Sequence, residues 1–199
     1  YKRQGRERSH LDSTSAARCS RLASHTAHAM TSYVLATANP HKKVEIEAIL
    51  AGLDITLLPR PTDVPDVEED GETLEENALK KARALVDATG YPAIADDTGL
   101  FVDAIDGLPG VRSARYAGDD ATDEENVLKL LRALQDVPAS ARTAHFRTVA
   151  AVAYPDGSWF VVDGSLPGVI ADAPRGANGF GYDVVFVPDG TKGLTLGEV

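Results

Sequence analysis

The chain has 199 residues and a formal net charge of −10, with 43% hydrophobic and 25% charged residues. This length suffices for one compact domain, and no apolar run approaches the roughly 18 residues needed to span a bilayer. An acidic chain argues against a nucleic-acid polymer as partner, because such partners are bound through lysine and arginine surfaces. A small phosphorylated ligand remains compatible, since one metal ion and a few local cations can hold it. The single cysteine, Cys19, excludes an internal disulfide and fits a reducing cytoplasm.

Residues 1–29 differ from the rest of the chain in composition. They hold six basic and two acidic residues, a net charge of +4, so the remainder carries −14. The segment fits either an Arg- and Ser-rich targeting peptide or an upstream extension with Met30 as the true beginning. We favour the second interpretation, because composition alone identifies targeting peptides poorly. We therefore expect a domain over residues 30–199, preceded by an extension that takes no part in the fold.

From Met30 onward, strand and helix patterns alternate through the first half of the body. Thr73 and Glu76 form a capping-box pair that opens a helix, and Gly90 is a natural C-terminal stop. A strand that ends in Asp96 and Asp97 follows. The elements expected here are strands at 33–37, 54–58 and 93–95, a helix at 40–52 with Val44, Ile46, Ile49 and Leu50 on one face, and a helix from 73 to about 89.

The second half reads as one helix followed by hairpins. Thr122 and Glu125 form another capping-box pair, and Pro155-Asp156-Gly157 is a hairpin turn. The expected elements are a strand at 101–105, a turn at 107–110, a helix from Thr122, strands at 143–154 and 158–162, and a last strand at 184–187. Because crossovers dominate the first half and hairpins the second, the pattern predicts an α/β fold with a mixed sheet.

The segment Thr37–Lys42 reads TANPHK and lies where a strand gives way to a helix. Exposed backbone N–H groups and the helix dipole favour an anion there, and Lys42 adds a point charge for a phosphate. The segment lacks the glycine-rich frame of a Walker A loop. Asn39 is equally an ordinary N-cap and Pro40 an ordinary first helical residue, so this signal alone leaves phosphate binding open.

Two acidic segments are candidates for metal binding or proton transfer. A run of seven carboxylates between Asp66 and Glu76 suits Mg²⁺, although it also fits a solvated loop and helix start. The segment IADDTG, residues 94–99, places two acids after an apolar strand, where one can point into a cleft and bind a metal or take a proton from water. The alternative is a turn-forming Asp pair before a glycine.

The segment GANGFGYD, residues 176–183, surrounds two aromatic residues with glycines. Such a loop can approach a flat ligand closely, and Phe180 or Tyr182 can stack on a base. The alternative is a tight turn with Phe180 in the core.

Taken together and in this order, five segments make the chain resemble the inosine triphosphate pyrophosphatase family, also called non-canonical purine NTP pyrophosphatases. They are LATANPHK (35–42), ENALKKA (76–82), AIADDTGL (93–100), GLPGVRSARYAG (107–118) and GFGYD (179–183). The resemblance implies an elongated α/β domain with a long central mixed sheet flanked by helices, a substrate cleft between two lobes, and usually a homodimer. It implies Mg²⁺-dependent hydrolysis of ITP, dITP and XTP to the monophosphate and pyrophosphate.

The resemblance also implies roles for single residues. Asp97 would take the proton of the attacking water and lie at the Mg²⁺, with Glu69 as a further metal carboxylate. The residues that would contact the triphosphate are Thr37, Ala38, Asn39, Pro40, His41 and Lys42, and Thr98 would be a further substrate contact. The residues that would form the base-binding loop are Phe180, Gly181, Tyr182 and Asp183.

One departure from the family concerns the end of the chain. Family members continue past the last strand into a helix with a lysine and then Ser-His-Arg, which binds the purine, whereas this sequence ends at Val199. We therefore expect an enzyme of this family with weakened recognition of the base. The alternatives are a catalytically impaired nucleotide-binding relic, and a pyrophosphatase acting on modified pyrimidine or general nucleoside triphosphates.

Overall fold

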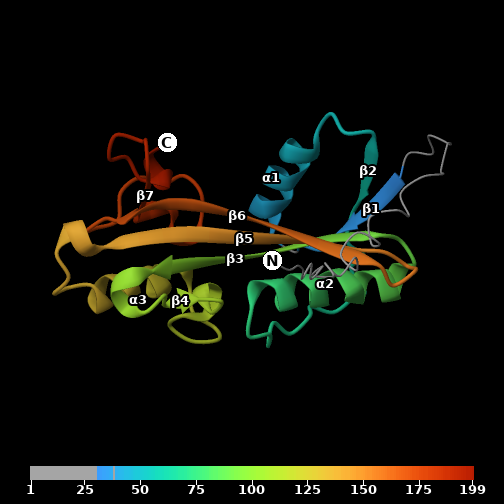
Figure 1. The fold of residues 1–199 in the computed structure, drawn as a ribbon, viewed down its shortest axis with the longest axis horizontal. Coiled ribbons are helices and arrows are strands. Elements are labelled where there is room, and N and C mark those ends of the chain that lie inside the picture. Colours follow the sequence, from blue (N-terminus) through green and yellow to red (C-terminus); the bar gives the residue numbers. More distant parts are fainter. Residues whose placement is uncertain (1–30, 38) are drawn as a thin grey trace, which may run out of the picture. The chain divides into compact units, whose positions relative to one another are not determined.

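The computed structural model describes residues 31–37 and 39–199 (Figure 1), so the expected extension over 1–29 lies outside the described part. The helices are α1 (Pro40–Leu50), α2 (Leu74–Thr89) and α3 (Asp123–Ala133). The strands are β1 (Thr31–Leu35), β2 (Ile55–Leu58), β3 (Ala93–Val102), β4 (Pro109–Gly110), β5 (Thr143–Ala153), β6 (Trp159–Ile170) and β7 (Phe186–Pro188). Short 3₁₀ helices lie at Asp103–Ile105, Ser113–Arg115, Ala139–Ala141, Gly181–Val184 and Leu196–Glu198.

The strands form one sheet in the order β2-β1-β3-β5-β6-β7, with β4 paired to β3. β1 is parallel to both β2 and β3, whereas the remaining pairs are antiparallel. The predicted α/β fold with a mixed sheet flanked by helices is therefore confirmed. α2 lies along one face of the sheet and α1 on the opposite side (Figure 1).

β3 has an interrupted edge at its centre. β1 pairs with β3 only at Ala93 and Ile94, and β4 pairs with it only at Leu100 and Phe101. Between these two partners, the stretch 95–99 is paired with β5 alone in the described registers. Side chains of this stretch therefore lie on a part of the β3 edge that neither β1 nor β4 covers in the described registers.

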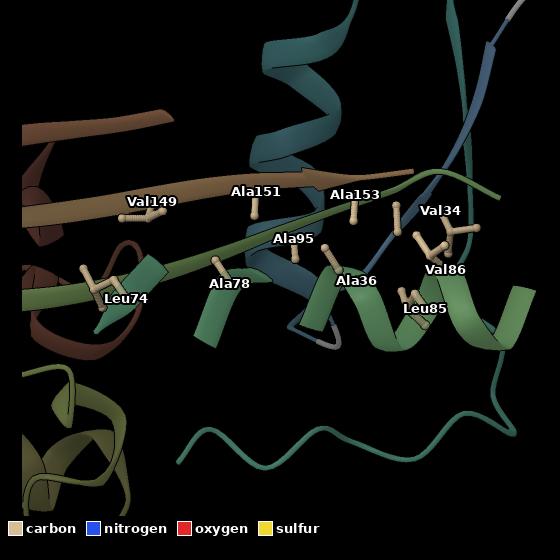
Figure 2. Packing of buried hydrophobic residues seen from close by; sticks show 12 residues of the cluster. Val34, Ala36, Leu74, Ala78, Leu85, Val86, Ala95, Val149, Ala151 and Ala153 are labelled. Atoms are coloured by element: carbon tan, nitrogen blue, oxygen red, sulfur yellow. The ribbon is translucent and has the colours of Figure 1, made fainter. Parts of the chain in front are cut away.

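Two apolar clusters hold the sheet and helices together. In the first, α2 packs its Leu74, Ala78 and Leu85 against alanines of β3 and β5 such as Ala95 and Ala151 (Figure 2). The small alanine side chains let the helix lie close to the sheet, and the interior excludes water. The second cluster combines β3, α3, the 3₁₀ helix at 181–184 and β7, with these buried members: Leu100, Val102, Val127, Leu130, Leu134, Ala144, Ile170, Tyr182, Val185 and Phe186.

α2 and α3 begin in the same way. Each has a threonine N-cap, Thr73 or Thr122, whose side chain accepts a hydrogen bond from the backbone three residues on, as predicted. Each also has a buried asparagine four residues after its threonine cap, Asn77 in α2 and Asn126 in α3. Buried amides need partners, so these two residues tie the start of each helix to its surroundings. Gly90 ends α2 in the left-handed conformation that its position predicted.

Three sequence-based expectations are wrong. The strand expected at 93–95 does not end at Asp96 and Asp97 but continues to Val102, because β5 pairs with it along its whole length. It thus includes the first residues of the strand expected at 101–105. The strand expected to close at 162 extends to Ile170, since β5 and then β7 pair with it. The last strand starts at Phe186 rather than Val184 because a 3₁₀ helix precedes it.

The apolar face expected on the first helix is not packed. Val44 and Ile49 are 65% and 78% exposed. None of the described side chains of α1, from Lys42 to Leu50, is buried. Packing therefore does little to hold α1, and polar contacts near its start carry more of that role.

Candidate active site

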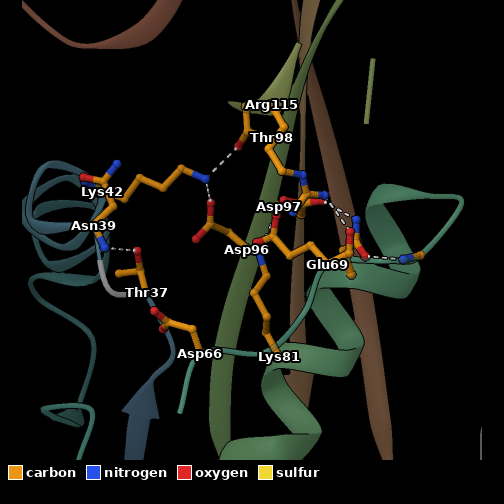
Figure 3. Close-up of polar contacts among 12 residues, drawn as sticks. Thr37, Asn39, Lys42, Asp66, Glu69, Lys81, Asp96, Asp97, Thr98 and Arg115 are labelled. Atoms are coloured by element: carbon orange, nitrogen blue, oxygen red, sulfur yellow. Dashed lines mark hydrogen bonds and ion pairs between the residues drawn. The ribbon is translucent and has the colours of Figure 1, made fainter. Parts of the chain in front are cut away.

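The two neighbouring acids of β3 lie on opposite faces of the sheet, because successive strand side chains alternate. Figure 3 shows Asp96 on the side of Lys42 and Asp97 on the side of Glu69 and Lys81. Both acids lie in the stretch of β3 that pairs with β5 on one edge and with neither β1 nor β4 on the other. The sequence prediction that the two acids face apart is confirmed, although they lie in mid-strand rather than at a strand end.

The segment before α1 folds into a capped turn. The Thr37 hydroxyl accepts a hydrogen bond from the Asn39 backbone N–H at 3.1 Å, and the Asn39 side chain accepts one from the Lys42 N–H at 3.4 Å. Asn39 therefore caps the helix, as the ordinary interpretation of the motif predicted. Ala38 lies outside the described residues, and the side chains of Pro40 and His41 are not described either.

Lys42 reaches from α1 to the sheet. Its Nζ lies 2.5 Å from Asp96 Oδ2 and 3.4 Å from Thr98 Oγ1, and Thr98 also bonds Thr148 of β5 at 3.0 Å. A lysine ammonium has three donors, so two of its hydrogens meet the sheet. The third can bind an anion beside the N-terminus of α1, where the backbone N–H groups favour negative charge.

Asp97 lies in a second polar cluster on the α2 side. Its Oδ1 accepts from Lys81 Nζ at 3.2 Å, and its Oδ2 accepts from Asn77 Nδ2 at 3.2 Å. Lys81 Nζ also lies 2.8 Å from Glu69 Oε1, and the Arg115 guanidinium donates to the Glu69 carbonyl at 2.6 Å. The structure thus brings Glu69 and Asp97 together through one lysine.

The charges of this cluster are coupled. Burial raises the pKa of the Asp97 carboxyl above its ordinary value, with the charge of Glu69 adding to the effect and the Lys81 ammonium opposing it. Burial alone would lower the pKa of Lys81, but the charges of Asp97 and Glu69 raise it. Lys81 is therefore a cation at neutral pH, and Asp97 is a stronger base than a free aspartate.

Glu69 and Asp97 offer the hard carboxylate oxygens that Mg²⁺ prefers. Mg²⁺ binds through one or two carboxylates, retained waters and phosphate oxygens rather than in an all-protein cage. Among the residues that the structure describes, no three His, Cys, Asp or Glu side chains converge in a metal-binding group. The pair therefore fits Mg²⁺ shared with a phosphate ligand, and it does not fit a closed structural site.

The rest of the acidic run does not join this pair. Four of its other members make contacts elsewhere: Asp66 with Arg60, Asp70 with Lys80, Glu75 with Arg147, and Glu76 with the Glu72 backbone N–H. Glu69 is the acid of the run that Lys81 joins to Asp97, and its role as a metal carboxylate stays a prediction. For the others named here, the alternative interpretation of a solvated loop and helix start holds.

The loop Phe180–Asp183 is held by its own polar groups. Asp183 Oδ2 accepts from the Phe180 N–H at 2.9 Å, and the Tyr182 hydroxyl donates to the Ser113 carbonyl at 2.9 Å. Gly181 donates its N–H to Asp123 Oδ2 at 2.9 Å. Tyr182 is buried in the second apolar cluster, whereas Phe180 is half-buried. Tyr182 and Asp183 therefore position the loop, and the Phe180 side chain is less buried than that of Tyr182.

Asp183 links this loop electrostatically to α1. Burial raises the pKa of its carboxyl, the Phe180 hydrogen bond opposes this, and the charges of Glu45 and Asp123 add to it. Glu45 lies on α1, three residues after Lys42. The negative charge of Glu45 on α1 therefore contributes to the raised pKa of the Asp183 carboxyl in this loop.

Sequence reasoning missed Lys81, Asn77 and Arg115. The first two belong to the segment ENALKKA, and they lie four residues apart on one face of α2. That spacing, next to a strand with two acids, was the available signal. Nothing in the local sequence around Arg115 indicated that it would bind the Glu69 backbone from 46 residues away.

The fold and these two clusters agree with the comparisons to known proteins. The chain belongs to the Ham1 family, whose model matches residues 33–199. It is 54% identical over 172 residues to the dITP/XTP pyrophosphatase of Geobacter sulfurreducens, covering 85% of this chain and 86% of that protein. The resemblance inferred from the five motifs is therefore confirmed.

Two solved structures share the fold. The HAM1 protein of Coxiella burnetii matches with a TM-score of 0.78 and 42% identity over 85% of this chain and 87% of its own. The nucleoside-triphosphatase / dITP/XTP pyrophosphatase of Mycobacterium abscessus matches with a TM-score of 0.71 and 42% identity over 85% and 89%. In the part of the chain that the structure covers, no helix has the length and apolar character to cross a bilayer.

Proposed function

We propose that this chain hydrolyses the non-canonical purine triphosphates dITP, ITP and XTP to the monophosphate and pyrophosphate, removing deaminated purines from the nucleotide pool. The observation that carries the proposal is the pair of clusters on either face of β3. One cluster offers a cation at a helix N-terminus, and the other a buried carboxylate beside a second acid. Membership of the Ham1 family and similarity to proteins named dITP/XTP pyrophosphatases support the choice of substrate.

In this proposal, the α1 side receives the phosphates. Lys42 and the backbone N–H groups at the start of α1 bind the triphosphate, with the turn from Thr37 to His41 around it. Thr98 adds a hydroxyl and holds the lysine. Because Asp96 already fixes Lys42 at 2.5 Å, little side-chain entropy remains to be lost on binding.

The α2 side carries the chemistry. Asp97 takes a proton from the water that attacks the α-phosphorus, and such general-base catalysis contributes roughly a factor of 10²–10⁴. Asn77 and Lys81 each hold one oxygen of Asp97 in the ligand-free chain, so the carboxylate is oriented before the substrate and metal arrive. Glu69 and Asp97 would hold Mg²⁺, which when bound neutralises developing negative charge and helps acidify the water.

The loop Phe180–Asp183 would meet the base. Phe180 can stack on it, and stacking on an aromatic ring contributes about 1–3 kcal/mol per base in nucleic-acid complexes. Gly179, at a φ of 73°, allows the approach of Asp183 that holds the loop, because a Cβ there would lie 2.1 Å from Asp183 Oδ2. Any larger residue at Gly179 would displace the loop.

Pyrophosphate release tests the proposal. Release is measured from dITP, ITP, XTP, GTP, ATP and pyrimidine triphosphates, with Mg²⁺ and with EDTA. We expect Mg²⁺-dependent release from the first three substrates at the highest kcat/KM. Nucleotide binding without release would support the impaired relic, and preference for pyrimidine or general triphosphates would support the other enzyme class.

We also propose that residues 30–199 form the catalytic domain after an extension over 1–29, and that the protein is a cytoplasmic homodimer. The family resemblance supports the dimer and the location. Light scattering with size-exclusion chromatography tests the oligomeric state directly. A monomeric mass at micromolar concentration would overturn the proposed dimer.

A further inference from the structure

Lys81 joins two carboxylates that come from different parts of the chain. Its Nζ lies 2.8 Å from Glu69 Oε1 and 3.2 Å from Asp97 Oδ1. Glu69 belongs to the loop before α2, Asp97 to β3 and Lys81 to the middle of α2 (Figure 3). The lysine side chain is only 17% exposed and that of Asp97 only 9%, so water screens this contact weakly.

The surroundings fix both acids in place around the lysine. Asn77 holds the second oxygen of Asp97, so this carboxylate cannot turn away from Lys81. Arg115 holds the Glu69 backbone carbonyl at 2.6 Å, which keeps that part of the loop against the site. Two carboxylates held close together repel each other unless a cation lies between them.

We infer that the Lys81 ammonium is a built-in counter-cation of the Glu69–Asp97 pair, and that Mg²⁺ has to displace it to reach these two carboxylates. The identity of the metal rests on the proposed function. The competition itself follows from geometry, because Lys81 bonds Glu69 Oε1 and Asp97 Oδ1, the same groups that a divalent cation would bind. Lys81 is thus a positioning residue that keeps the site assembled and keeps its affinity for Mg²⁺ alone low.

Such an arrangement couples metal binding to substrate binding. A triphosphate brings its own oxygens and negative charge, which offset the cost of moving the ammonium away from the carboxylates. Mg²⁺ is therefore expected to enter together with the triphosphate rather than before it.

The neighbouring Lys80 provides a matched control. It lies on the same helix and pairs with Asp70 of the same loop at 2.5 Å, but its side chain is 43% exposed and that of Asp70 61%. Exposed ion pairs contribute little to stability. Replacing Lys80 therefore removes the same charge from the same helix without touching Glu69 or Asp97.

Calorimetric titration with Mg²⁺ alone, without nucleotide, tests the competition. We expect Lys81→Met to bind Mg²⁺ at least about tenfold more tightly than the wild-type protein, since a neighbouring unit charge no longer repels the divalent ion. Lys80→Met should bind Mg²⁺ as the wild-type protein does. Equal or weaker binding by Lys81→Met would overturn the inference.

Thermal unfolding in EDTA tests the counter-cation role separately. Lys81→Met should lower Tm by about 4–8 °C, because it leaves two partly buried carboxylates uncompensated. Adding Glu69→Gln should recover part of this loss, since it removes the repulsion, and this recovery is measurable even where Lys81→Met alone is largely unfolded. A double variant no more stable than Lys81→Met would refute the role. Neither measurement uses a nucleotide. Their outcome therefore does not depend on whether the chain hydrolyses the proposed substrates.

Discussion

Replacing Asn77 by alanine should separate its structural role from its role beside Asp97. Asn77 is fully buried, and its Oδ1 accepts from the Gly71 backbone N–H at 2.8 Å while its Nδ2 donates to Asp97 Oδ2 at 3.2 Å. The change leaves the Gly71 N–H and one oxygen of Asp97 without this partner. It also lets Asp97 rotate, so both stability and turnover should fall.

The size of the effect follows from these contacts. An unsatisfied buried polar group costs about 1–3 kcal/mol, and Gly71 is partly exposed, so we expect a loss of about 2–4 kcal/mol in unfolding free energy. For a domain of this size, that loss lowers Tm by about 4–16 °C. A displaced catalytic group can cost about 10²-fold in rate, and we expect kcat to fall by that order.

Asn126 offers the matched control on α3. It is also buried, its Oδ1 accepts from the Ala117 N–H at 2.7 Å, and its Nδ2 donates to the Ala114 carbonyl at 3.0 Å. Asn126→Ala should therefore lose similar stability but keep its kcat when both variants are assayed well below their melting temperatures. Thermal unfolding and steady-state pyrophosphate release give both quantities. If the two variants lost kcat equally, or if Asn77→Ala kept it, Asn77 would have no special link to the chemistry.

Three further predictions concern other parts of the chain. Lys42→Ala should weaken binding of the triphosphate far more than binding of the free nucleoside, and equal losses in calorimetry would remove Lys42 from the phosphate site. Because burial raises the pKa of Asp97, the acidic limb of the kcat/KM profile should lie above the range of an ordinary carboxyl group; a limb within that range would argue against Asp97 as the base. Deleting residues 1–29 should leave Tm and activity unchanged, since the segment lacks a periodic apolar face to pack; a drop of several degrees would show that it docks.

The sequence predicted those features that depend only on residues close together in the chain, such as helix caps and helix ends. The threonine caps of α2 and α3 and the glycine stop at Gly90 depend on a few neighbouring residues, and each was identified from the sequence. The mixed sheet followed from the order of crossovers and hairpins. In α3 the full reciprocal capping box is present, whereas in α2 the Glu76 side chain accepts from the Glu72 N–H instead of the Thr73 N–H.

Features that depend on distant partners were not predictable in this way. Asp96-Asp97 before a glycine resembles a turn, yet β5 pairs across it and keeps the strand extended. Gly99 also serves long-range packing, because a Cβ there would lie 2.5 Å from the Gly110 carbonyl oxygen. Likewise, the placement of Glu69 beside Asp97 depends on Lys81 and Arg115, which reach it from other elements.

The two adjacent acids of β3 provide a last prediction, because each serves a different face. Asp96 holds Lys42 at 2.5 Å, and no described side chain of α1 is buried, so this ion pair is an important link between helix and sheet. Asp96→Asn should therefore raise KM for the triphosphate by about 3–10-fold, the range of a partly buried ion pair, with little change in kcat. Asp97→Asn should keep the fold and lose about 10²–10⁴-fold in kcat, since an amide cannot take the proton. Steady-state kinetics with circular dichroism compares the two variants. If Asp96→Asn lowered kcat as much as Asp97→Asn does, the division between a binding face and a chemical face would be wrong.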